Sequence, residues 1–274
     1  MIGIGISLSI SANTIVDSEV KVEPWEVLFN TLSPNSTRLE ILWPDPHFWF
    51  SDSAGMVPWV SGPVRGWRST AGTLFNQPTN SDFAPSATAF ANGNVALSFD
   101  GVDDTLTSDI IYPLGPTSEY LHMGGMVISG VNISTSYSHV AGIYQDISRR
   151  LDLTARSTAT LYGVQAVGRV TGTNLLSSLP NDISRRGLPF IFQQSLTSTR
   201  LDFLYKDSVA ITANTPATGT LSASGSFPYA IGSQASGMPM IVGPLVLREG
   251  LLPSALALAA AESIINDYIG VSLR

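Results

Sequence analysis

The sequence predicts an all-β protein, an antiparallel β-sandwich with an extended N-terminal arm and one C-terminal α-helix. Short apolar runs separated by Gly, Pro, Asn, Asp and Ser recur through most of the 274 residues, a pattern typical of sandwiches and barrels. These runs do not alternate with helical patterns, so a parallel sheet is not expected. An Ala-rich run near the C-terminus predicts the helix.

The first thirteen residues predict the extended arm. Apolar residues alternate there with Gly or Ser, and a period of two residues indicates a strand. An isolated strand is not stable in water, so we expect the arm to pair with the chain's own body, as a plain edge strand, or with a partner chain. The apolar positions of the arm are Ile2, Ile4, Ile6, Leu8 and Ile10.

Residues 14–42 are interpreted as a linker and collar. They include Glu23–Phe29, which predicts a short helix because Pro24 suits a first helical turn. We therefore divide the chain into an arm and collar for anchoring, residues 1–40, and a sandwich with its C-terminal helix, residues 41–274.

The remaining elements follow from local signals in chain order. Ser254 can cap the final helix, Leu256–Tyr268 carry it and Gly270 ends it. Its Ala-rich face allows close approach to a sheet. The expected strands are Val95–Phe99, Met126–Ser129, His139–Tyr144, Leu151–Thr154, Thr160–Val164, Phe190–Gln194, Leu201–Tyr205, Val209–Thr212, Tyr229–Gly232 and Met240–Arg248.

Charge and composition exclude several classes of function. Charged residues make up 13% of the chain and the net charge is −7, whereas nucleic-acid binding needs a basic stripe. The pairs Arg149–Arg150 and Arg185–Arg186 are too small for one. The absence of cysteine excludes disulfides, thiol chemistry and cysteine-type zinc sites. No apolar stretch approaches the roughly 18 residues of a membrane helix, and the N-terminus lacks the basic region of a signal peptide.

The pentapeptide Asp-Ile-Ser-Arg-Arg occurs twice, at residues 146–150 and 182–186. Nothing around the two copies matches, so a repeat architecture is not indicated. We interpret the two copies as a coincidence or as two similar turns.

Three groups of segments, in this order, resemble the concanavalin A-like, laminin G-like (LamG) jelly-roll domains common in tailed-phage structural proteins. The resemblance covers about residues 41–274. Its most specific element is Phe-Asp-Gly-x-Asp-Asp within Leu97–Leu106. The other segments are Trp43–Asp45, Asp52–Gly55, Val64–Ser69 and Gln77–Thr79 before it, and Tyr229–Ser233 and Gly243–Leu252 with the terminal helix after it.

The resemblance implies a virion structural protein, either a tail fibre or spike component or a head decoration. Such a protein is made in the host cytoplasm and carried on the extracellular particle. The arm would bind other virion proteins by strand addition, and a homotrimer is the oligomer favoured by the resemblance.

The alternative is a glycan-binding module that recognises the host surface. Sugar sites combine aromatic platforms with polar groups, and any single aromatic residue more often packs in a core. The weak candidates on expected loops are Trp49, Trp59, Trp67, Tyr112 and Tyr137, with Asp100, Asp103 and Asn132 as polar partners.

The segment after Phe99 contains Asp100, Asp103 and Asp104. Turn chemistry is the favoured interpretation, because Asp and Gly together stabilise tight turns. A calcium site is the functional alternative, since hard cations prefer several carboxylate oxygens. No other cofactor is expected.

Catalysis is the least favoured function, although the same fold hosts glycoside hydrolases. Those enzymes need two carboxylates about 5–5.5 Å apart, or somewhat farther for inversion. Glu119 is the only glutamate between Asp45 and Arg248, and Asp202 is expected to face solvent. The three histidines are scattered, and no nucleophile elbow or phosphate loop is present. The sequence thus predicts a protein that is not an enzyme.

Overall fold

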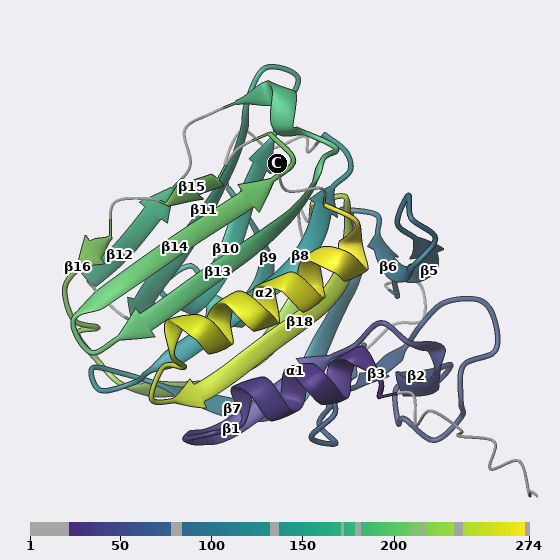
Figure 1. The fold of residues 1–274 in the computed structure, drawn as a ribbon, viewed down its shortest axis with the longest axis horizontal. Coiled ribbons are helices and arrows are strands. Elements are labelled where there is room, and N and C mark those ends of the chain that lie inside the picture. The colour runs from purple at the N-terminus through teal and green to yellow at the C-terminus, as the bar shows by residue number, and fades with distance from the viewer. Residues whose placement is uncertain are drawn as a thin grey trace, which may run out of the picture.

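The computed structural model describes residues 22–77, 84–131, 137–170, 173–178, 182–209, 211–213, 216–232 and 238–271. The arm positions Ile2, Ile4, Ile6, Leu8 and Ile10, and also Asn132, lie outside the described residues. Within them, two antiparallel sheets face each other and two helices, α1 (Pro24–Leu32) and α2 (Ala255–Ile269), lie against one sheet (Figure 1). This arrangement confirms the prediction of an all-β sandwich with a C-terminal helix.

The first sheet lies under the helices. Its strands are β1 (Ser36–Leu42), β5 (Ser86–Ala89), β6 (Val95–Phe99), β8 (Tyr120–Ile128), β13 (Pro189–Thr197), β14 (Arg200–Asp207), β15 (Ile211–Ala213), β16 (Ala217–Thr218) and β18 (Met240–Gly250). The strand order is β15-β14-β13-β8-β18-β6-β5, with β1 paired to β18 and β16 paired to β14.

The second sheet lies behind the first in Figure 1. Its strands are β2 (Trp49–Phe50), β3 (Gly66–Arg68), β4 (Leu74–Asn76), β7 (Thr105–Leu114), β9 (Ser138–Asp146), β10 (Arg149–Ser157), β11 (Tyr162–Val170), β12 (Thr173–Ser178) and β17 (Gly225–Gly232). Their order is β12-β11-β10-β9-β17-β7-β4-β3-β2.

A chain of polar side chains crosses the apolar core between the two sheets. The Tyr229 hydroxyl donates to His122 Nε2 at 2.6 Å, and His122 Nδ1 donates to Gln194 Oε1 at 3.2 Å. The Gln194 amide donates in turn to the carbonyl oxygens of Asp152 and Val167 in the second sheet. Tyr229, His122 and Gln194 each have a hydrogen-bond partner in this series, so these buried polar groups are satisfied without an ionised imidazole.

The outer face of the first sheet forms a second apolar core with the helices. Ile265 and Ile269 of α2 pack there, and a Cβ built on Gly125 of β8 would lie 2.6 Å from Ile269 Cγ2. The side chain of Ser254 caps α2 by accepting from the Ala257 N–H, and Gly270 ends it at a φ of 73°. Both ends agree with the sequence prediction. Neither described helix combines the length and the apolar character needed to cross a bilayer.

The segment interpreted as a collar belongs to the sandwich. β1 pairs with β18 in antiparallel register, and Leu28 and Leu32 of α1 are buried in the second core. The buried Arg248 of β18 fixes this segment by donating to the carbonyl oxygens of Leu32 and Pro34, both at 2.7 Å. The apolar faces of α1 and β1 are thus covered by packing on this sheet, and the division at residue 40 into an anchoring segment and a sandwich stays a prediction.

Candidate functional site

The outer face of the second sheet carries a polar strip on three neighbouring strands. Along β10 the even-numbered residues alternate with Leu151, Leu153 and Ala155, which belong to the inter-sheet core. The even-numbered side chains therefore point away from the core. The strip consists of Tyr144 and His139 on β9, Arg150, Asp152, Thr154 and Arg156 on β10, and Gln165, Val167 and Arg169 on β11.

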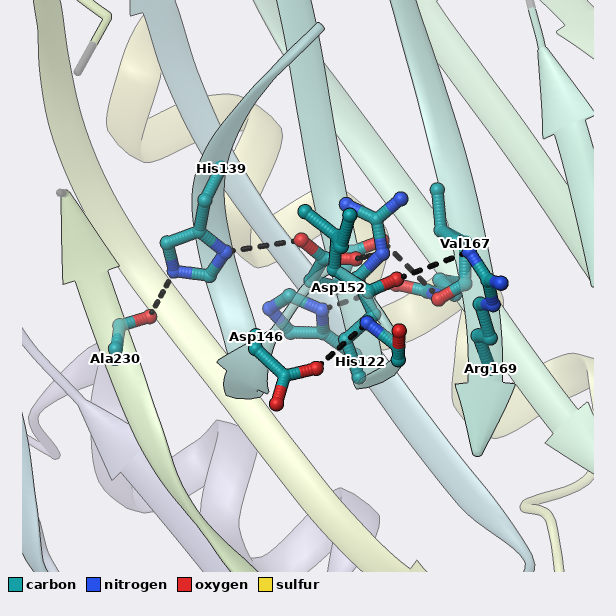
Figure 2. A network of polar contacts seen from close by, with 11 residues as sticks. His122, His139, Asp146, Asp152, Val167, Arg169 and Ala230 are labelled. Carbon is teal, nitrogen blue, oxygen red and sulfur yellow. Dashed lines mark hydrogen bonds and ion pairs between the residues drawn. The ribbon is translucent and has the colours of Figure 1, made fainter. Parts of the chain in front are cut away.

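Asp152 lies at the centre of this strip and is fully buried. One carboxylate oxygen accepts a hydrogen bond from His139 Nδ1 at 2.9 Å, while His139 Nε2 lies 3.1 Å from the Ala230 carbonyl oxygen (Figure 2). His139 thus bridges two oxygen atoms, the Asp152 carboxylate on β10 and the Ala230 carbonyl on β17. The other carboxylate oxygen lies 3.8 Å from Arg150 Nε and accepts no hydrogen bond from the described residues.

An aromatic ring and two arginines lie in one cross-strand row beside Asp152. Tyr144 is directly opposite Arg150, and Arg150 is directly opposite Arg169. The Tyr144 ring stacks on His139 at 4.2 Å between centroids. Burial raises the pKa of Tyr144 and the charge of Asp152 adds to this, against the opposing effect of Arg150. Tyr144 therefore presents a neutral ring and hydroxyl at neutral pH.

The strip is basic although the chain as a whole is acidic. Residues 138–170 contain four arginines and two aspartates, and no lysine or glutamate, so this segment carries +2 while the whole chain carries −7. Arg156 extends the basic surface and lies 4.7 Å above the ring of Tyr137. Guanidinium groups and aromatic rings together suit a ligand with both a flat apolar face and hydrogen-bonding groups.

The aromatic residues singled out from the sequence occupy different positions. Trp49, Trp67 and Tyr112 are fully buried in the inter-sheet core, which corrects the expectation of exposed loop platforms. Trp59 packs edge-on against Trp49, with centroids 5.3 Å apart, and donates from Nε1 to the Gly62 carbonyl. Among the five, Tyr137 lies at the polar strip.

Tyr144, Arg150 and Arg169 were not predicted from the sequence as site residues. The signal was the alternation of polar and apolar residues from Arg150 to Arg156, which places four polar side chains on one face. The repeated pentapeptide gave a second signal. In the first copy Asp146 accepts from the Ser148 N–H at 2.7 Å, and in the second Asp182 accepts from the Ser184 N–H at 3.1 Å. The two copies thus share this Asp hydrogen bond, but the first copy is the hairpin turn between β9 and β10 and the second forms the 3-10 helix Ile183–Arg185.

The three aspartates after β6 lie together as their spacing suggested. One oxygen from each carboxylate lies within 4.8 Å of the others. Asp104 accepts from the Asp100 N–H at 2.8 Å, and Asp100 accepts from the Val102 N–H at 2.7 Å, which is turn chemistry. Burial raises the pKa of Asp104 to about 6; the backbone hydrogen bond opposes this, and the charges of Asp100 and Asp103 add to it. Calcium binding here stays a prediction.

A cavity of about 620 Å³ opens between α1, α2 and the segments around Trp43 and Asn94. Its aromatic residues are engaged in packing: Trp43 is 4% exposed, and the Tyr268 hydroxyl donates to backbone carbonyls of Pro44 and Val95. The charged residues in its lining are Glu23, Asp45 and Asp267. Among its described lining residues, the cavity therefore offers neither a free aromatic platform nor a cation.

Comparisons with known proteins add evidence on the fold. No protein-family model matches the sequence, and no curated protein matches it. Among solved structures, a Trypanosoma rangeli sialidase has a TM-score of 0.51 at 12% identity, over 91% of this chain and 38% of the sialidase. An arabinofuranosidase complexed with arabinofuranosyl-alpha-1,2-xylobiose has a TM-score of 0.52 at 10% identity, over 74% of this chain and 50% of that enzyme.

This chain shares its fold with parts of glycoside hydrolases. A GH54 α-L-arabinofuranosidase mutant soaked with 4-nitrophenyl α-L-arabinofuranoside gives a third such match, with a TM-score of 0.50 at 9% identity over 74% of this chain and 50% of that one. The chain thus spans half or less of the length of these proteins. The prediction that the chain is not an enzyme is wrong, because it rested on the absence of familiar motifs, and the solved structures that share this fold are enzymes.

Proposed function

We propose that this chain is a glycan-binding β-sandwich whose binding face is the polar strip of β9, β10 and β11. The observation that carries the proposal is the row Tyr144–Arg150–Arg169 beside the buried Asp152. The fold similarity to glycoside hydrolases supports a role in carbohydrate recognition. A sandwich sheet provides rigid support, which keeps the loss of conformational entropy on binding small.

Each residue of the row has a defined part in binding. The Tyr144 ring provides an apolar surface for the face of a sugar, as aromatic side chains do at ligand sites. Arg150 and Arg169 donate hydrogen bonds to sugar oxygens. Asp152 and His139 lie beneath them and position Arg150 and the Tyr144 ring through the contacts described above.

A Tyr144→Ala variant tests this proposal. We expect its affinity for the glycans that bind the wild-type chain on a broad glycan array to fall about tenfold, the size of a lost aromatic contact. Trp59→Ala is the matched control and should bind like wild type, because Trp59 lies in the loop after β2 and packs on Trp49 of this far edge strand. Equal binding by the Tyr144 variant, with its fold intact by circular dichroism, would refute the role of the row. Release of reducing ends, measured on the same samples, reports whether the glycan is also cleaved.

We further propose that the glycan-binding sandwich is displayed on a phage particle. In this proposal the alternating arm anchors the chain to other virion proteins, and the chain assembles as a trimer. The support is the LamG-like sequence pattern together with the period-two arm, which suits strand addition to a neighbouring subunit.

Deleting residues 1–13 tests the particle role. The deletion should remove the chain from purified particles while the isolated sandwich stays folded, because the described helices and strands all lie after residue 23. Copy number per particle, measured by quantitative mass spectrometry, is the readout. Unchanged particle occupancy after the deletion would rule out the arm as the anchor.

A further inference from the structure

We propose that the polar strip selects acidic glycans, binding the carboxylate of a sugar acid between Arg150 and Arg169. This inference rests on the proposed glycan-binding function and names the class of sugar. It starts from the register of the sheet, in which the two arginines are directly opposite each other on the outer face.

Two like charges directly opposite on a sheet destabilise it. Their Cβ atoms lie only about 5 Å apart in such a pair, and the neighbouring acid does not neutralise both. Asp152 approaches Arg150 at 3.8 Å but is also bonded to His139, and it lies opposite Val167 rather than Arg169. A bound anion between the two guanidinium groups would relieve this repulsion.

The two arginines also have donors that the described residues leave unused. Arg169 makes one long hydrogen bond, from Nη1 to the Ile147 carbonyl at 3.4 Å, and its Nε has no hydrogen-bond partner. The terminal nitrogens of Arg150 form no hydrogen bond or ion pair with the described residues. Guanidinium donors that are held on a rigid strand and lack partners are suited to a planar anion.

In the second copy of the pentapeptide, both arginines make contacts within the protein. There Arg185 contacts Asp182 at 3.2 Å and Asp207 at 3.8 Å, and Arg186 donates to the Thr158 carbonyl. Arg185 and Arg186 are thus both engaged by other residues of the fold. Arg150 in the first copy and Arg169 opposite it make fewer such contacts, so their guanidinium groups are available to a ligand.

The neighbouring Tyr144 favours a sugar acid over a free anion. The row from Tyr144 to Arg169 spans two strand spacings, about 10 Å, so a ring stacked on Tyr144 can extend its carboxylate toward the arginines. The basic segment is small and the rest of the chain is acidic, which disfavours long, densely charged polyanions such as nucleic acids.

The test uses the full chain and pairs of ligands that differ only in charge. Binding of oligogalacturonide, oligoglucuronide and oligosialic acid is measured by calorimetry, each beside its carboxyl-reduced form. A neutral glucan, a sulfated galactan and single-stranded DNA complete the panel. We expect at least one carboxylated ligand to bind at least tenfold more tightly than its reduced form, since hydrogen bonds between charged groups are the stronger ones.

The variant Arg169→Gln tests the role of this arginine in binding. Its affinity for the carboxylated ligand should fall at least tenfold, while its unfolding temperature stays equal to or above that of wild type because the like-charge pair is gone. Arg200→Gln removes an exposed arginine from β14 of the first sheet and should leave binding unchanged. A purely structural role for Arg169 would lower the unfolding temperature instead.

The remaining outcomes separate this inference from the proposed function. Equal binding of carboxylated and reduced forms, or binding of neutral glycans alone, overturns the acidic specificity and leaves the glycan-binding function standing. A preference for the sulfated galactan or for DNA also overturns the carboxylate assignment. No binding to any glycan of the panel or of a broad array overturns both.

Discussion

Replacing Arg248 by methionine lowers the free energy of unfolding by about 3–5 kcal/mol, the range expected when a buried charged group that holds several partners is removed. The Arg248 side chain is fully buried, and it donates to the carbonyl oxygens of Leu32, Pro34, Gly250 and Leu251. Methionine fills much of the volume but leaves these carbonyls without donors.

Thermal unfolding measures this effect. At about 2–4 °C per kcal/mol for a chain of this size class, the unfolding temperature falls by roughly 10 °C. Arg200→Met is the matched control, because Arg200 is half exposed and its ion pair with Asp202 contributes little. A loss below about 1 kcal/mol in the Arg248 variant would show that α1 and β1 are not fixed to the sheet as described.

Acid destabilises the chain through the buried His122. Burial lowers the pKa of His122 to about 3, and the hydrogen bond to Gln194 opposes this only in part. In the unfolded chain the imidazole titrates at about 6.5. The unfolded state therefore binds a proton, between about pH 6.5 and pH 3, that the folded state does not accept. The stabilising contribution is complete above pH 6.5 and is lost as the pH falls through this range, with a slope of about 1.4 kcal/mol per pH unit.

Urea unfolding at a series of pH values measures the slope. His122→Gln removes the titrating group, so its stability should change less than that of wild type between pH 6.5 and pH 4, although its stability at neutral pH is lower. Asp104 acts with the opposite sign, because its pKa is raised to about 6, and comparing the two proteins cancels its effect. His47→Gln alters an exposed histidine, with a side chain 92% exposed, and should follow the wild-type profile. Parallel profiles for wild type and the His122 variant would show that His122 does not cause the acid destabilisation.

The sequence predicted the elements whose signals are local. Ser254 as the cap and Gly270 as the terminator predicted both ends of α2, and apolar runs bounded by turn residues predicted parts of most long strands. β7 was not predicted, because Asp109 and Pro113 interrupt its apolar pattern. β1 and α1 were assigned to a collar for a different reason. Their apolar faces are short, and only packing against β18 and α2 shows that they belong to the core.

The candidate site depended on information that no single segment carries. Tyr144, Arg150 and Arg169 come from three strands, and only the strand register places them in one row. Trp49 and Trp67 were attractive candidates because tryptophan often contacts sugars, yet large aromatic side chains also fill cores. The strand register determines which side chains face the core, and it depends on long-range strand pairing rather than on the local sequence pattern.

Hydrogen exchange with and without the tightest-binding glycan tests most directly where the ligand binds. We expect slower exchange in β9, β10 and β11, centred on the hairpin that joins residues 144 and 150, with no change around α1 and α2. Slower exchange confined to the segments around Trp43 and Tyr268, which line the cavity beside the helices, would contradict this expectation.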